Sequence, residues 1–173
     1  VGKLEEKKHP ADLLEALARL PPDVRSRAHV LVAGDGPLRA ECEELVREKR
    51  LPVSFAGFLN QSRLPDAYAA ADVLVLPSDA GETWGLVVNE AMASGRPAVV
   101  SRAAGSCADL VVAGETGQSF VCRDIPALSG ILAAYLADSG LAARQGLAAS
   151  RHIQAYGIDA AVAGIVSAVR ACT

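Results

Sequence analysis

The chain has 173 residues, of which 51% are hydrophobic and 21% are charged, and its formal net charge at pH 7 is −3. This length fits one domain with a sizeable core and leaves no room for a second. The acidic balance gives no broad basic surface, so we do not expect nucleic acid as a partner. Apolar runs such as ADVLVLP are far shorter than the roughly 18 residues that suggest a membrane span, which favours a soluble domain.

Apolar runs alternate with helical patterns along the chain. In order, the patterns predict a helix near 11–20, a strand at 29–33, a helix over 37–49, a strand at 53–57, a helix near 62–71, a strand at 73–76, a helix over 85–94, and strands at 98–101 and 119–121. Three Ala-rich helices near 125–137, 141–154 and 159–171 complete the series. This order predicts an α/β fold, with a parallel sheet that carries helices on both faces.

The cysteines and histidines do not form a metal-binding pattern. Cys42, Cys107, Cys122 and Cys172 show no C-x-x-C spacing, and the three histidines do not cluster with them in sequence. We therefore expect no structural zinc site. Partly buried free thiols are typical of a reducing compartment, which indicates a cytoplasmic location.

Two glutamates frame the start of a predicted helix. Glu82 lies in the loop after an apolar strand, and Glu90 lies about two turns into the helix that follows. Between them, Gly85 lets the backbone come close to a ligand. Free N–H groups at a helix start can hold phosphate, so this segment predicts a ligand-binding site.

At these residues the chain resembles the retaining glycosyltransferases of family 4 (group 1), which have the GT-B fold and use activated sugar donors. The family signature reads E-x-[FW]-G-x4-E-A-M-A-x-G-x-P, and it is matched by Glu82, Trp84, Gly85, Glu90, Ala91, Met92, Ala93, Gly95 and Pro97. Further segments resemble family blocks in the same order: GKLEEKKHPADLLEAL, HVLVAGDGPLRAECEEL, VSFAGFL, ADVLVLPS and GETGQSFV.

The resemblance implies that residues 1–173 form the Rossmann-like C-terminal half of a GT-B fold, which binds a nucleoside-diphosphate sugar. In the family, an N-terminal acceptor-binding domain and the first strand of this half precede the GKL segment, so both are expected outside this chain. We expect negligible sugar transfer without that partner domain. Membrane association is expected only through the parent enzyme, as a peripheral contact.

The resemblance also assigns the site residues. Glu82 is the catalytic residue that positions the transferred sugar, and Glu90 binds the ribose hydroxyls. The diphosphate is held by Lys3, Lys8 and the backbone of Gly85, Leu86 and Val87. The nucleotide pocket is lined by Gly34, Gly36, Phe58 and Leu59. No metal and no cofactor are implied, because the lysines and backbone donors offset the charge of the leaving diphosphate.

Simpler interpretations remain open for several of these residues. Glu82 could favour the positive end of the helix without binding a ligand, and Lys3 and Lys8 could belong to a solvated charged loop. Phe58 could be a core residue. A dinucleotide-binding G-x-G-x-x-G motif fails, because Arg39 stands at its third glycine.

Two rival functions also remain: a GT-B nucleotide-sugar epimerase and a donor-binding module without turnover. The sequence specifies neither the base and sugar of the donor nor the acceptor.

Overall fold

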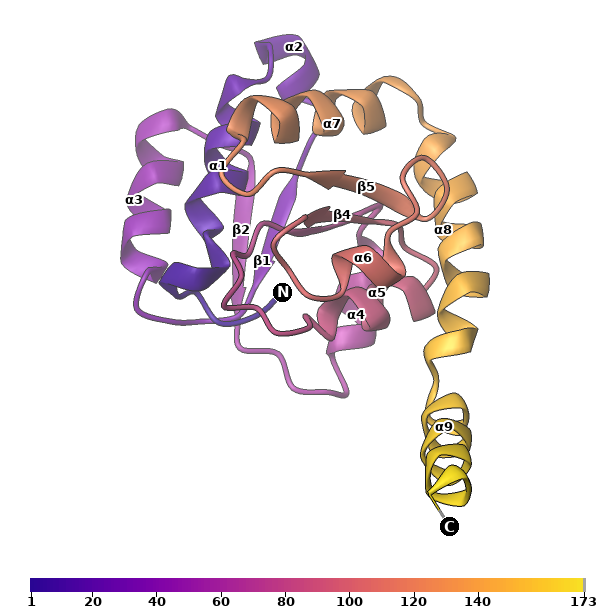
Figure 1. The fold of residues 1–173 in the computed structure, drawn as a ribbon. Coiled ribbons are helices and arrows are strands. Elements are labelled where there is room, and N and C mark those ends of the chain that lie inside the picture. Colours follow the sequence, from indigo (N-terminus) through magenta and orange to yellow (C-terminus); the bar gives the residue numbers. More distant parts are fainter. Residues whose placement is uncertain (173) are drawn as a thin grey trace.

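The computed structural model describes residues 1–172 and contains five strands and nine α-helices within them (Figure 1). The strands are β1 Val30–Ala33, β2 Val53–Gly57, β3 Leu74–Leu76, β4 Ala98–Ser101 and β5 Gly117–Phe120. The helices are α1 Pro10–Arg19, α2 Pro22–Arg25, α3 Arg39–Lys49, α4 Leu64–Ala70, α5 Val87–Ala93, α6 Cys107–Leu110, α7 Ile125–Ala137, α8 Leu141–His152 and α9 Ile158–Ala171. Two 3₁₀ turns, η1 Glu6–Lys8 and η2 Ile153–Tyr156, complete the fold.

Every strand pairing is parallel, as the sequence predicts. Within residues 1–172, however, the strands form two ladders, β1–β2 and β3–β4–β5, instead of one continuous sheet. The opening segment runs beside the end of β1, because the N–H groups of Gly2 and Leu4 donate to the carbonyls of Ala33 and Asp35 at 2.9 Å. An apolar cavity lies between β1 and β3, and its walls include Leu31, Val32, Leu13, Leu14, Val75 and Leu76.

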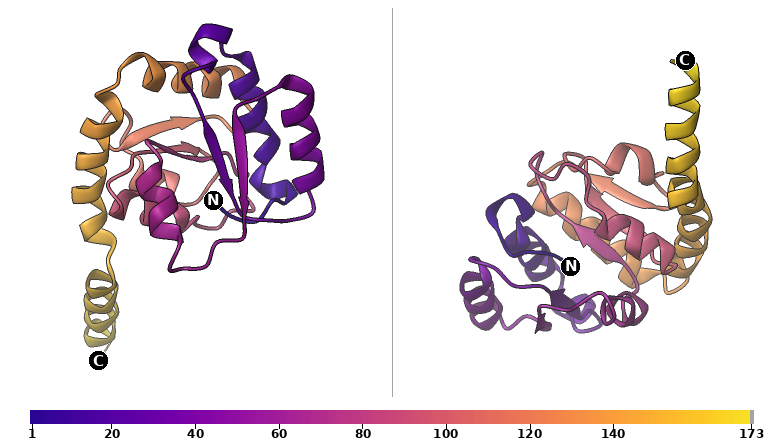
Figure 2. Two further views of the ribbon diagram at one scale, coloured as in Figure 1. Left: turned by 180° about the vertical axis from the view of Figure 1, so that it is seen from behind. Right: turned by 90° about the horizontal axis from the view of Figure 1, so that it is seen from below.

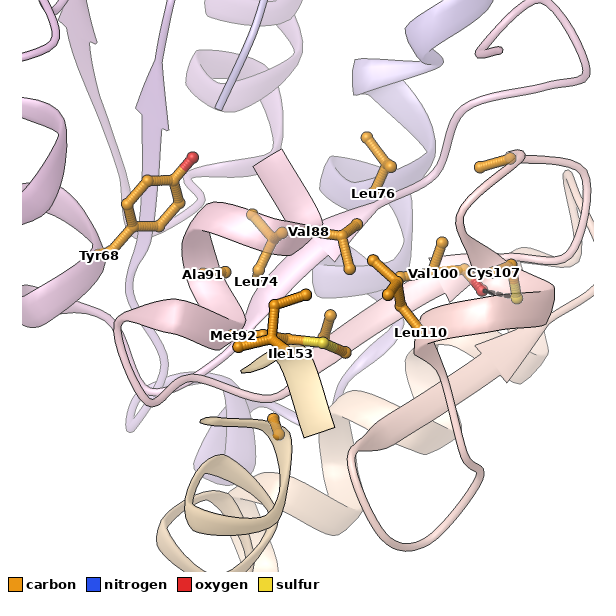
Figure 3. Close-up of a cluster of buried hydrophobic side chains, with 13 residues drawn as sticks. Tyr68, Leu74, Leu76, Val88, Ala91, Met92, Val100, Cys107, Leu110 and Ile153 are labelled. Carbon is orange, nitrogen blue, oxygen red and sulfur yellow. Dashed lines mark hydrogen bonds between the residues drawn. The ribbon is translucent and has the colours of Figure 1, made fainter. Parts of the chain in front are cut away.

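The strands β3 and β4 send alternate side chains to opposite faces. Leu74, Leu76 and Val100 join a core cluster with residues of α5, α6 and α8, part of which Figure 3 shows. Val75 and Val99 pack on the other side, in a cluster formed with α1, α3 and α7. This two-sided burial confirms the predicted helices on both faces, and it explains why β3 is apolar throughout and β4 is apolar up to Ser101.

The structure differs from the sequence-based expectations mainly at short elements. The helices α2 and α6 have four residues each and were not predicted, because one helical turn gives no measurable apolar period. The last strand lies at Gly117–Phe120 instead of 119–121. The helix expected from residue 85 begins at Val87, so Gly85 and Leu86 belong to the preceding loop.

The last two helices differ in how they meet the domain. The segment Leu141–Ala171 is long enough to cross a membrane and contains an 18-residue stretch with a mean hydropathy of 1.2, which the separate apolar runs did not indicate. However, α8 buries Gln145, Gly146 and Ala149 against the domain, and η2 interrupts the helical path. Figure 2 shows α9 projecting away from the body, and it buries none of its described residues.

Candidate functional site

The structure brings Lys8 and Glu82 together at the carboxyl ends of the strands. Lys8 ends the η1 turn, Glu82 lies in the loop after β3, and their side chains form an ion pair across 74 residues of sequence. The lysine side chain is 18% exposed and the glutamate side chain 12%. The predicted phosphate cation and the predicted sugar-positioning carboxylate therefore share one partly shielded location.

Hydrogen bonds within the loop that carries Glu82, and from it to two neighbouring segments, hold this loop in place. A tight turn forms at Asp79, whose side chain accepts from the N–H of Gly81 at 2.7 Å and whose carbonyl accepts from the N–H of Glu82 at 3.0 Å. The N–H of Asp79 donates to the Lys7 carbonyl at 2.9 Å, and the N–H of Gly105 donates to the Glu82 carbonyl at 3.0 Å. These bonds place Glu82 between η1 and the loop after β4.

The backbone after Glu82 offers unpaired donors. Gly85 has a φ of +93°, and a Cβ atom there would lie 2.7 Å from Leu76 Cδ2, so no other residue fits without displacement. Within residues 1–172, the N–H groups of Gly85, Leu86 and Val87 donate no hydrogen bond. Three successive free N–H groups, in the loop whose Glu82 pairs with Lys8, form an arrangement suited to the oxygens of an anion.

Glu90 lies on α5 and borders a second cavity. Its Oε2 accepts a hydrogen bond of 2.6 Å from the Tyr68 hydroxyl, and both residues line a cavity with Gln61, Leu64, Pro65 and Ser94. Burial, and next the neighbouring Glu90 carboxylate, raise the pKa of Tyr68 well above its ordinary value. The tyrosine therefore keeps its proton and remains a donor.

Lys3 lines the same cavity as Lys8 but does not contact the two glutamates. Its side chain is 65% exposed, and its Nζ lies 3.3 Å from a Glu5 carboxylate oxygen. Within residues 1–172, no hydrogen bond or ion pair connects Lys3 with Glu82 or Glu90. The alternative that these lysines belong to a solvated charged loop therefore fits Lys3 better than Lys8.

The four predicted pocket residues make no hydrogen bond or ion pair with Lys8 or Glu82 within residues 1–172. Cβ atoms on Gly34 and Gly36 would lie 1.8 Å from the Gly2 carbonyl oxygen and 2.4 Å from that of Leu4, so these glycines let the opening segment pass. Phe58 follows β2 and is 81% exposed, which excludes the core interpretation. Leu59 is half-buried next to it.

A polar cluster that no sequence pattern indicated lies next to Lys8 in the chain. His9 follows Lys8 in the left-handed region, with a φ of 43°, and its Nε2 lies 3.2 Å from an Asp79 oxygen. Its Nδ1 lies 2.9 Å from Arg123 Nη1, which also lies 3.2 Å from the buried Asp12 carboxylate. If Arg123 donates to Nδ1, the imidazole is neutral and its Nε2–H donates to Asp79. The positive φ at residue 9 gives no local sequence signal.

Metal-binding groups are scarce in the part of the chain that the structure describes. No group of three His, Cys, Asp or Glu side chains is close enough there to hold a metal ion. The cysteines are free thiols, and burial raises the pKa of Cys42 and of Cys107. Both buried thiols are therefore poorly reactive.

Parallel ladders between two helical layers, with charged loops gathered at the carboxyl ends of the strands, define an α/β ligand-binding domain. The family model of the glycosyl transferases group 1 matches residues 1–152. The chain belongs to this family, and its fold is that of the GT-B glycosyltransferase structures it resembles.

Individual relatives agree with this assignment. The D-inositol 3-phosphate glycosyltransferase of Streptomyces coelicolor is 37% identical over 172 residues, which cover 94% of this chain and 37% of the relative. The crystal structure of Anabaena HepE in complex with UDP and glucose is 25% identical, with a TM-score of 0.82, covering 98% of this chain and 47% of HepE. Sucrose-phosphate synthase from Thermosynechococcus elongatus is 28% identical, with a TM-score of 0.80, covering 99% and 45%. The chain thus spans less than half the length of these relatives.

Proposed function

We propose that this chain is the donor-binding domain of a retaining glycosyltransferase, which binds a nucleoside-diphosphate sugar for transfer to an acceptor held by a further domain. The observation that carries the proposal is the convergence at one loop of Lys8, Glu82 and the unpaired N–H groups of Gly85, Leu86 and Val87. A leaving diphosphate needs cationic and dipolar donors of this kind, fixed in place before the reaction.

The roles of the two glutamates follow from their surroundings. Glu82 sits beside the predicted diphosphate donors and can accept hydrogen bonds from sugar hydroxyls. Glu90 lies on the wall of a separate cavity, where its carboxylate can accept from the ribose. The family assignment and the complexes of HepE, which contain UDP with glucose and UDP-glucose, support a nucleotide sugar as the ligand.

The proposed site uses no metal ion and no cofactor, because Lys8 and the backbone N–H groups supply the positive field. The test is calorimetry of the chain with UDP, GDP and ADP in the presence of a chelator. Binding of at least one of them is expected. If a folded sample binds none at millimolar concentration, the donor-site assignment is wrong.

The partner domain is part of the proposal. The D-inositol 3-phosphate glycosyltransferase and HepE are each more than twice as long as this chain. Holding donor and acceptor together can lower a barrier by about 7–11 kcal/mol. We therefore propose that the chain alone binds donor but transfers sugar negligibly. Sugar transfer by the chain and by a longer parent at equal donor occupancy tests this, and comparable rates would show that residues 1–173 hold a complete active site.

The two rival functions have distinct products. An epimerase would convert the sugar nucleotide without an acceptor, and a module without turnover would give no product even in the parent protein. Product analysis of the parent with and without acceptor separates both rivals from glycosyl transfer.

A further inference from the structure

The contact between Tyr68 and Glu90 joins two helices at the edge of the second cavity. Tyr68 comes from α4 and is 4% exposed, and its ring belongs to the core cluster with Leu74, Ala91 and Met92. Figure 3 shows the ring at the edge of this cluster, with the hydroxyl turned away from Met92. A ring packed in this way cannot change rotamer freely, so the position of the hydroxyl is fixed by the core.

The fixed hydroxyl in turn restrains a flexible acid. Glu90 is exposed on α5, and an exposed glutamate otherwise samples many rotamers. The 2.6 Å bond from Tyr68 engages Oε2 of Glu90. Within residues 1–172, Oε1 accepts no hydrogen bond, so the carboxylate offers one held oxygen and one free acceptor on the cavity wall.

We propose that Tyr68 is a positioning residue for ribose recognition: it holds Oε2 of Glu90 so that the carboxylate is already oriented to accept from a vicinal diol. This inference rests on the proposed function. A carboxylate meets the two neighbouring hydroxyls of a ribose better when its rotamer is fixed before binding, because less side-chain entropy is then lost. Tyr68 itself does not touch the nucleotide.

A positioning role of Tyr68 is distinguished from a purely structural one by comparing nucleotides with and without the ribose hydroxyls. Tyr68→Phe keeps the buried ring and removes only the donor. We expect it to weaken UDP binding by about threefold to tenfold, the usual worth of one hydrogen bond. Binding of 2′,3′-dideoxy-UDP, which lacks the diol, is expected to stay within about twofold of the unmodified chain.

A second tyrosine provides the matched control. Tyr135 on α7 donates to Gln145, and burial raises its pKa to about 12. Tyr135→Phe therefore also removes a hydroxyl donor, a partly buried one, but it should leave the ratio of UDP to dideoxy-UDP affinity unchanged. Glu90→Asp is the second test variant, since its shorter side chain withdraws the carboxylate from Tyr68 and should lower the same ratio.

Calorimetry of the unmodified chain and the three variants with both nucleotides distinguishes the outcomes. Selective loss of UDP binding in Tyr68→Phe and Glu90→Asp supports the inference. Equal loss of both nucleotides, or no loss of either, would overturn it while leaving the proposed function intact. If the unmodified chain binds none of UDP, GDP and ADP, the proposed function fails, and this inference fails with it.

Discussion

Glu82→Gln should strengthen the binding of a bare nucleoside diphosphate. In the unliganded chain Glu82 holds Lys8 in a partly shielded ion pair. Exposed ion pairs contribute up to about 1 kcal/mol, and charge-assisted hydrogen bonds about 1.5–3 kcal/mol. Because both side chains retain some exposure, we take about 1 kcal/mol as the worth of the pair. A bound phosphate must replace Glu82 as the partner of Lys8, so the energy of the ion pair opposes nucleotide binding. Removing the negative charge of Glu82 should therefore tighten UDP binding by up to about fivefold.

The assay is calorimetry with UDP for the unmodified chain, Glu82→Gln and Lys8→Met. Lys8→Met should have the opposite sign and weaken UDP. Glu5→Gln is the matched control, because Glu5 pairs with the exposed Lys3 and its loss should leave UDP binding unchanged. Glu82→Gln should also lose any preference for UDP-glucose over UDP. The reasoning is refuted if Glu82→Gln weakens UDP as much as Lys8→Met does.

Three further outcomes follow from single side chains. Lys3→Ala should reduce UDP affinity less than Lys8→Ala in the same calorimetry, and an equal or greater loss would show that Lys3 moves into the site. Gly34→Ala should lower the free energy of unfolding by about 1–3 kcal/mol or more, because its Cβ would overlap backbone. Gly164→Ala, with open space around it, should instead be neutral or stabilising in thermal melts; a similar loss at both sites would contradict the packing argument. Burial raises the pKa of Asp12 above its ordinary value of 3.8. The folded chain therefore binds the Asp12 proton more tightly than the unfolded chain does, and this proton stabilises the fold at low pH. The stabilisation is lost as the pH rises through the raised pKa. Asp12→Asn should therefore gain stability relative to the unmodified chain as the pH rises above about 4, and a pH-independent difference would rule this out.

Local patterns predicted much of the fold. The apolar run at Ala98–Ser101 forms a strand that is buried throughout, and such a continuous run is visible in sequence. The run at Val30–Ala33 is equally visible, although Leu31 in it is 38% exposed. The one-turn helices α2 and α6 were missed because they are shorter than the window that reveals a period. The separation of β1 from β3 could not be predicted, since strand pairing depends on the spatial order of the strands.

The site could be predicted only in part. The spacing of Glu82, Gly85 and Glu90 lies within one segment and indicates a site directly. The ion pair of Glu82 with Lys8 and the contact of Glu90 with Tyr68 join residues 74 and 22 positions apart. No local pattern encodes these contacts, because they depend on how η1 and α4 pack against the loop and helix of the signature. The exposure of Lys3 likewise depends on how distant segments pack and is not encoded in a local pattern.

The position of the donor site is tested most directly by a nuclear magnetic resonance titration of the ¹⁵N-labelled chain with UDP, or with GDP or ADP if UDP does not bind. The N–H groups of Gly85, Leu86 and Val87 are unpaired without ligand and are proposed to donate to the diphosphate. Their amide signals should therefore show the largest saturable shifts, together with the Lys8 amide. Amides of α9, such as Val162, should stay in place. Saturable shifts confined to other parts of the chain would contradict the proposed site.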